Sequence, residues 1–488
     1  MKKNIYKIVW IFLLSGVVFS CKKDFLQVVP KGDLIPTTTS DYDLLMNSYA
    51  FYQYPNGLPT LLLGDDVVEE ESYFNYRNTN ATASATQLFQ YQGTIYKVSD
   101  VPLEVQTYMA NIYVCNKIIN EVMASTQGTD AQKKSLVAEA RATRAWVNFQ
   151  LINFYGKPYL ASTAGTDLGF PIVETAEVSQ KNFSRGTVQG MYDFIIEDLT
   201  AAIPDLPVKS VIQTRMSKTA AQGILGKVYL FMGKYTEALT QFNASFAGLA
   251  ASVTPAVLYD YNVTLAPGGS FLPVSSFGPN YPGNNATDMT ESILAKTSNA
   301  GSYNGQGFGN TGLELNPAIR ALFAPSDLRL QLYANHFDDG STVPGGRIRK
   351  YAVKYAWTGL QLSDLYLMRA EVRARLNDLT GAKEDVEYLR KRRMPLASAA
   401  VPSATASDQS ALIKFIIEER EREFAQEGYR WFDMRRLSVD PIFAGTAYSH
   451  SVYTIAGGTQ TYPMPSARMV MQLPPNMMTA NPDFVNNQ

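Results

Sequence analysis

The sequence predicts a mostly α-helical protein in which antiparallel helix pairs carry long, irregular loop insertions. Three observations support this prediction. Apolar residues recur at three- and four-residue spacings over residues 104–246 and again over 359–437, which is the period of an amphipathic helix. Glycine or proline ends several of these stretches, and the connections between them are short, as between antiparallel neighbours. Residues 247–358 are rich in Gly, Pro, Ser and Asn and show no sustained period.

Each predicted helix depends on an apolar stripe, and a helix-breaking residue ends several of them. The second helix is amphipathic up to Phe154, where Gly156 and Pro158 end it. Pro204 ends the third helix and Gly233 ends the fourth. The predicted helices span residues 103–123, 131–154, 187–203, 218–232, 235–246, 363–375, 381–393 and 408–429.

Two stretches of these helices suggest a repeat. Residues 229–238 read YLFMGKYTEA and resemble the corner between the two helices of a tetratricopeptide repeat. Residues 370–382 have a related pattern, but neither stretch gives a clean period of about 34 residues. We therefore predict a degenerate tetratricopeptide-like scaffold. Unrelated helical hairpins in a generic α-helical domain are the alternative.

The remaining segments are predicted to be irregular parts of the same domain. Residues 21–103 form a polar and aromatic N-terminal segment, residues 247–358 a loop-rich insertion, and residues 438–488 a proline-rich tail. A structureless insertion of that length inside a compact domain is usually functional. We therefore expect one domain over residues 21–488, with helix pairs at 104–246 and 359–437.

The composition excludes several function classes. The 488 residues include 43 Lys and Arg against 44 Asp and Glu, a formal net charge of −1. That balance argues against a nucleic-acid partner and against a polybasic membrane surface. Two cysteines and two histidines are too few for a cysteine-rich or histidine-rich metal site. No Asp-x-Asp-x-Asp-Gly calcium loop occurs, so we predict no cofactor, with structural calcium as the alternative. The scarcity of histidine and cysteine favours binding over catalysis.

The first twenty residues have the features of a lipoprotein signal peptide. Three lysines flank the start of an apolar run over residues 8–19, which is too short to span a membrane. Cys21 follows directly, which predicts cleavage before this residue and acylation of its sulfur and amine. Removal of the signal leaves 40 basic against 44 acidic residues, a mature charge of −4. An ordinary secretory peptide with an accidental cysteine is the alternative.

Several motifs along the chain resemble one family. Residues 138–149 read AEARATRAWVNF and are followed by NFYGKP at 153–158, and residues 417–436 read IEEREREFAQEGYRWFDMRR. Shorter matches lie at residues 215–221, 364–371, 462–465 and 481–482. In this order they resemble the SusD/RagB family of surface nutrient-binding lipoproteins.

The resemblance implies a non-catalytic protein of the outer membrane, lipid-anchored through Cys21 and facing the cell exterior. Such a protein would capture an oligosaccharide or polysaccharide and deliver it to a SusC-like TonB-dependent transporter, over whose barrel it acts as a lid. The resemblance also places the ligand site on loops of the N-terminal segment and of the insertion.

The N-terminal segment has the composition of a sugar site. Residues 49–96 contain ten aromatics in 48 positions, interleaved with Asp, Asn and Arg. Aromatic rings can cover the apolar faces of sugars while polar groups bind their hydroxyls, and tyrosine offers both. Starch-type members of the family that the chain resembles often use a tryptophan, and none occurs there, which disfavours a starch-like ligand. Packing of these rings onto the helices is the structural alternative. The candidate ligand-binding residues are Asp66, Tyr73, Tyr76, Arg77 and Tyr91, together with Tyr281 and Tyr303 of the insertion.

Two other functions use the same residues. The scaffold could bind peptides or another nutrient, because the aromatic residues suit that cargo too. A helical glycoside hydrolase would need two carboxyl groups about 5–10 Å apart, and Asp65, Asp66 and Glu69–Glu71 are its candidate acids. The charged residues of the family motifs are expected to form ion pairs rather than a catalytic group, and they include Glu139, Arg141, Arg144, Arg430, Asp433 and Arg435.

Overall fold

Helices dominate the protein, as predicted. The computed structural model describes residues 35–54, 58–80, 83–180, 183–208, 212–275, 278–299, 312–337, 339–351 and 355–488. The predicted helices are present within a few residues of their expected bounds. They are α6 (Leu103–Glu121), α7 (Asp130–Tyr155), α8 (Val188–Ala202), α9 (Lys218–Phe231), α10 (Tyr235–Gly248), α13 (Leu362–Arg375), α14 (Leu379–Arg393) and α16 (Gln409–Phe424).

The helices begin at residues that satisfy their free N–H groups. The side chain of Thr129 accepts a hydrogen bond from the backbone of Gln132, and the Gln132 side chain accepts one from Thr129, a reciprocal cap on α7. Thr187, Ser217 and Asp408 cap α8, α9 and α16 with one side-chain bond each. The sequence therefore encodes the starts of these helices locally.

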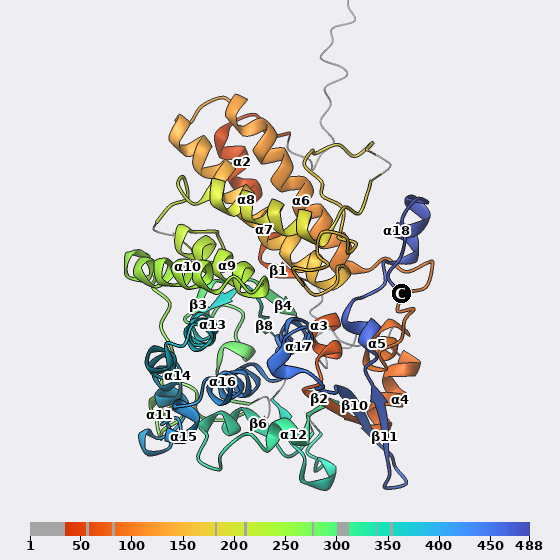
Figure 1. Ribbon diagram of the computed structural model, residues 1–488, viewed down its shortest axis with the longest axis vertical. Helices are drawn as coiled ribbons and strands as arrows, with labels where there is room; N and C mark the ends of the chain where they lie inside the picture. The colour runs from red at the N-terminus through yellow and green to blue at the C-terminus, as the bar shows by residue number, and fades with distance from the viewer. Residues whose placement is uncertain are drawn as a thin grey trace, which may run out of the picture.

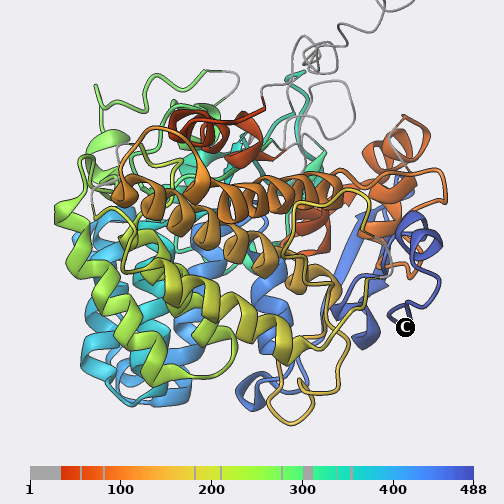
Figure 2. The ribbon, with the colours of Figure 1, turned by 90° about the horizontal axis from the view of Figure 1, so that it is seen from above.

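Successive helices pack as antiparallel pairs that stack into a scaffold. Helices α6 and α7 lie side by side (Figure 2), α9 packs on α10, and α13 packs on α14 and α16. Gly226 of α9 permits the close approach of α10, because a Cβ atom there would lie 2.6 Å from the ring of Phe242. Figure 1 shows these pairs as consecutive layers down the molecule.

The predicted helix over 408–429 is interrupted. Helix α16 ends at Phe424, and a second helix, α17 (Arg430–Leu437), follows after a sharp turn. Gln426 and Gly428 have φ angles of 61° and 82° in that turn, a conformation that no α-helix contains. The turn brings α17 back against the end of α7.

The N-terminal segment is more ordered than expected. It forms α2 (Thr39–Met46), α3 (Leu58–Leu63), α4 (Glu71–Asn80) and α5 (Ala83–Phe89). These helices are short, and α4 has little amphipathic character, so the periodicity that revealed the longer helices was absent. Tertiary contacts rather than intrinsic propensity must hold helices of this length.

One sheet joins the two ends of the chain. Strand β2 (Val67–Glu70) lies between β5 (Leu313–Leu315) and β10 (Ser449–Tyr453), and β11 (Thr459–Pro463) forms the edge. Glu69 pairs with Val452, and Val68 with Glu314. The N-terminal segment, the insertion and the tail, all predicted to be irregular, therefore meet here (Figure 1).

Three smaller sheets order the insertion. Their strands are two or three residues long, too short for a period to show in the sequence. They comprise β1 (Gln53–Tyr54) with β4 (Thr297–Asn299) and β8 (Tyr355–Trp357), β3 (Ser292–Leu294) with β9 (Leu360–Gln361), and β6 (Tyr333–Ala334) with β7 (Arg349–Lys350).

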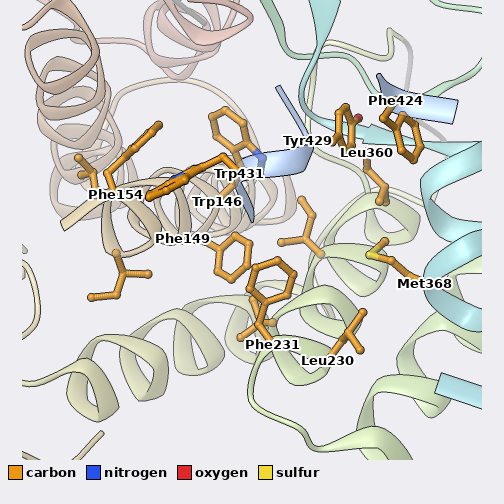
Figure 3. Close-up of a cluster of buried hydrophobic side chains, with 14 of the residues drawn as sticks. Trp146, Phe149, Phe154, Leu230, Phe231, Leu360, Met368, Phe424, Tyr429 and Trp431 are labelled. Carbon is orange, nitrogen blue, oxygen red and sulfur yellow. The ribbon is translucent and has the colours of Figure 1, made fainter. Parts of the chain in front are cut away.

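The main core lies between the helix pairs and α17. Trp146 of α7 and Trp431 of α17 are almost fully buried there, and Phe149 meets Phe231 edge to face with ring centroids 5.1 Å apart (Figure 3). Cys115 is buried in a neighbouring cluster between α6 and α7, as expected of a core thiol. No helix in the described part of the chain is long and apolar enough to cross a membrane.

Most of the predicted ion pairs are present. Arg144 and Arg141 both contact Asp198, Glu139 binds Arg215, Asp433 binds Arg420 and Arg436, and Arg430 binds Asp65 and Glu421. The prediction is wrong for Arg435. Its Nη2 donates to the carbonyl of Gly156 at 2.6 Å, and its guanidinium lies against the ring of Trp431 without a described acid partner.

Candidate functional site

Two of the predicted ligand residues, Asp66 and Tyr91, lie in the interior. The carboxylate of Asp66 accepts a 2.6 Å hydrogen bond from the backbone N–H of Gln426, and burial raises the pKa of Asp66 to about 6. Tyr91 stacks on His450 with ring centroids 4.5 Å apart. Both side chains are buried, so they support the scaffold instead of facing a ligand in solution.

Tyr73 lies at the surface, within a group of aromatic rings. This half-buried residue of α4 packs against Phe337 with ring centroids 4.8 Å apart. Gly312 lies against the base of the Tyr73 side chain: a Cβ atom at Gly312 would be 2.7 Å from Cβ of Tyr73. The ring is therefore fixed between two segments of the insertion.

Tyr281 contacts the backbone of a second pair of rings in the insertion. It is buried, and its hydroxyl donates to the carbonyl of Tyr351 at 3.3 Å. The half-buried ring of Tyr351 meets His336 edge to face, 6.1 Å between centroids, and His336 precedes Phe337. We call Tyr73, Tyr281, His336, Phe337 and Tyr351 the aromatic cluster.

A small cavity lies beside the buried face of Tyr281. It has a volume of about 50 Å³, and Trp357, Lys350 and Glu427 are among its lining residues. That volume suits one or two water molecules. It is far too small for an oligosaccharide, so a glycan would have to bind on the exposed side of the aromatic cluster.

The other predicted residues are placed only in part. Helix α4 puts positions 73, 76 and 77 at i, i+3 and i+4, a spacing that shares one helix face. The side chains of Tyr76 and Arg77 lie outside the described part of the structure, as do Tyr303 and Cys21. The backbone of α4 therefore places positions 76 and 77 on the same helix face as Tyr73. Tyr303 lies outside the described residues.

Gln426 links the segments that surround the cluster. Its Oε1 accepts from the backbone N–H of Lys350 at 2.8 Å, and its Nε2 donates to the carbonyl of Leu313 at 3.1 Å. Lys350 precedes Tyr351, and Leu313 follows the Gly312 that touches Tyr73. Together with the bond from its backbone to Asp66, Gln426 joins β5, β7 and the residue that precedes β2 in one place.

The acids proposed for a hydrolase are held by structural contacts. Asp65 pairs with Arg430, Glu70 with Arg347, and Glu71 accepts from the backbone N–H of Ile455 at 2.8 Å. Glu314 also binds Arg347, and burial raises the pKa of Glu314 to about 8. Glu70 and Glu314 thus share the Arg347 guanidinium as their ion-pair partner.

Sequence reasoning missed the residues that organise this site. His336, Phe337 and Tyr351 come from the insertion, where no local period marks them, and Gln426 lies in a motif whose sequence predicts one helix. The glycine that follows two residues later, Gly428, was the available signal for a turn. In the described residues, no group of three or more His, Cys, Asp or Glu side chains could hold a metal ion.

Two family models match the chain. Residues 24–230 match the family described as "Starch-binding associating with outer membrane", and residues 331–488 match the SusD family. The fold and these matches define a SusD-type helical scaffold. The chain belongs to the SusD/RagB-like family, as its motifs suggested.

Individual relatives agree over the full length. A SusD-like protein P2 from Formosa agariphila is 23% identical and covers 99% of this chain and 100% of its own. A putative sugar binding protein from Bacteroides vulgatus has a TM-score of 0.68 at 19% identity, with 93% of this chain and 99% of that chain covered. A laminarin binding SusD-like protein has a TM-score of 0.60 at 16% identity, covering 92% and 99%. The two structures show that the fold is shared.

Proposed function

We propose that this protein is a non-catalytic, glycan-binding lipoprotein of the outer membrane. It captures an oligosaccharide or polysaccharide outside the cell and delivers it to a partner SusC-like TonB-dependent transporter. The match of residues 24–230 to a family described as starch-binding and associated with the outer membrane carries this proposal. The sugar-binding and laminarin-binding names of the two structural relatives support it.

The aromatic cluster supplies the chemistry for such a ligand. Tyr73 and Tyr351 are half-buried, so part of each side chain is open to solvent. Phe337 and Gly312 fix one of these rings, and the Tyr281 hydroxyl fixes the backbone of the other. Rings that are already ordered lose little conformational entropy when a sugar binds them.

Two alternatives make different predictions. A peptide or another nutrient could use the same rings, so the cargo must be identified by direct binding. Catalysis is disfavoured because Asp65, Glu70 and Glu71 are engaged in structural contacts. Retention of an intact polysaccharide without release of shorter sugars supports a binding protein.

The test is affinity electrophoresis across a panel that includes laminarin and starch, followed by calorimetry on the retained glycan. Tyr73→Ala and Tyr351→Ala should each weaken binding about tenfold or more, a loss of roughly 1.4 kcal/mol, because each removes a contact ring. Tyr113→Ala is the matched control, since Tyr113 is an exposed tyrosine on α6 and should retain full affinity.

Three outcomes would contradict this assignment. Unchanged affinity in both cluster variants would place the glycan elsewhere on the loops. Binding of peptides but of no glycan would favour the second cargo class. Shortened sugars after incubation with the purified protein would establish an enzyme. Circular dichroism of each variant shows whether the fold is intact.

A further inference from the structure

His450 of β10 is fully buried between two aromatic rings. Its imidazole stacks on Phe89 with centroids 4.3 Å apart and on Tyr91 with centroids 4.5 Å apart, and the interplanar angles are 17° and 11°. Phe89 ends α5, and Tyr91 lies just beyond it. The tail is thereby inserted into the N-terminal segment.

Both ring nitrogens of His450 face backbone carbonyl oxygens. Nδ1 lies 2.7 Å from the carbonyl oxygen of Phe89, and Nε2 lies 2.6 Å from that of Gly64. A carbonyl oxygen only accepts hydrogen bonds, whereas a neutral imidazole has a single N–H. Donation to both carbonyls would need a proton on each nitrogen, as in an imidazolium.

The surroundings also stabilise a positive charge. Phe89 is the last residue of α5, and Gly64 directly follows the last residue of α3. Carbonyls at helix C-termini carry partial negative charge and lack intrahelical partners. The faces of Phe89 and Tyr91 add an attraction between a cation and aromatic rings.

We infer that His450 is held as an imidazolium that clasps the tail to the N-terminal segment, and that this clasp opens when the ring loses a proton at alkaline pH. In the neutral ring, Nδ1 keeps its bond to Phe89, and Nε2 accepts from the Tyr91 hydroxyl, 3.1 Å away. The carbonyl of Gly64 then loses its donor. This releases the corner between α3 and β2, which leads directly into α4 and Tyr73.

Other ionisable groups surround the clasp and share its electrostatic field. Asp65 and Asp66 follow Gly64, and Arg430 of α17 pairs with Asp65 and with Glu421 of α16. Burial raises the pKa of Asp66 to about 6 and that of Glu421 to about 7, and it raises the pKa of Tyr91 well above its ordinary value. The experiments must therefore distinguish the titration of His450 from that of Asp66 and Glu421.

Nuclear magnetic resonance detects this proton directly. The chain has two histidines, so a sample with ¹⁵N-labelled histidine and a His336→Asn substitution reports on His450 alone. At pH 7.5 both ring nitrogens should show the shift of a protonated nitrogen and a bound hydrogen that exchanges slowly. One protonated and one bare nitrogen at pH 7.5 would overturn the inference.

A Tyr91→Phe variant separates the two protonation states. It removes the hydroxyl that a neutral ring would use and leaves both carbonyl contacts of the imidazolium in place. Both nitrogens should stay protonated in Tyr91→Phe at pH 7.5. Loss of one proton signal in this variant would show that the hydroxyl, and not the carbonyl of Gly64, determines the state of the ring.

Urea unfolding measures the coupling to stability. An exposed imidazole in the unfolded chain loses its proton near pH 6.5, whereas the folded chain retains it. The unfolding equilibrium constant should therefore rise by about tenfold per pH unit above pH 6.5, up to the midpoint found by resonance. His450→Asn should show a slope lower by one proton, and an equal slope in both proteins would overturn the clasp.

The expected effect on glycan binding rests on the proposed function, whereas the protonation of His450 does not. If the clasp holds α4, affinity for the retained glycan should fall in the parent protein as the pH rises through the midpoint found by resonance. His450→Asn should show weak, pH-independent affinity. A protonated His450 with pH-independent binding in the parent would confine the clasp to stability and overturn its connection to the site.

Discussion

Gly312 illustrates how a single residue without a side chain determines the position of a ring. The backbone at Gly312 lies against Cβ, Cγ and Cδ1 of Tyr73, each within 2.9 Å of where its own Cβ would be. Real Cβ atoms do not approach that closely, so any larger residue must displace Tyr73. The contact cannot be found in the sequence, because the two residues are far apart in the chain.

Gly312→Ala should therefore weaken glycan affinity several-fold and destabilise the protein by about 1–3 kcal/mol, the usual cost of overpacking. Gly165→Ala is the control, because a Cβ atom there meets nothing within 4 Å. Calorimetric titration and urea unfolding give the two quantities. Full affinity in Gly312→Ala would show that the ring of Tyr73 is not held by this contact.

Helix α16 connects the scaffold to the insertion through buried ion pairs. Glu419 is fully buried and binds Arg390 of α14 at 2.6 Å, Arg422 at 2.8 Å, and Arg329 of the insertion at 2.7 Å. These guanidinium groups keep the pKa of Glu419 well below its ordinary range, against the opposing effect of burial. Removal of this carboxylate would take from Arg390 and Arg422 their described acid partner, whereas Arg329 would keep Asp327 and Glu423.

Glu419→Gln should lower the free energy of unfolding by about 3–5 kcal/mol at pH 7. Glu418→Gln is the control, since this half-exposed neighbour should change stability by less than about 0.5 kcal/mol. Because the folded-state pKa of Glu419 is lowered, its contribution is present above about pH 4.3 and is lost as the pH falls below that value. Urea unfolding at pH 7 and pH 3.5 should show the difference between parent and variant shrinking with acidification; a constant difference would contradict the assignment.

At the scale of the whole molecule, local patterns predicted the helices but not the site. Capping residues and apolar periods are encoded within a single helix, as at Thr129 and Thr187, so these elements could be located. The aromatic cluster combines Tyr73 with Phe337 and Tyr351, whose proximity depends on pairing between remote strands. Asp66 and Tyr91 have the chemistry of ligand-binding residues, and only the tertiary structure shows that their side chains are directed inward.

Membrane attachment is the remaining whole-molecule prediction. Cys21→Ala should abolish labelling with palmitate and move the protein out of the membrane fraction, because the predicted acylated residue is missing. The parent protein, solubilised from that fraction, should copurify with a TonB-dependent transporter. Normal labelling of the variant would contradict the predicted anchor, and a parent that purifies alone would contradict the proposed partner.

The sheet that joins β2 to β10 has a consequence for the time course of biogenesis. A chain that emerges N-terminus first completes β2 at Glu70 long before Ser449 and the rest of β10 exist. Until then the neighbouring α3, α4 and α5 lack both a strand partner and His450. The helix pairs contact near neighbours in the chain and can form early, whereas pairing between remote segments is slow. The part of the protein that contains Tyr73 is thus assembled last, and a chain cut short before β10 would have a folded scaffold without a completed site.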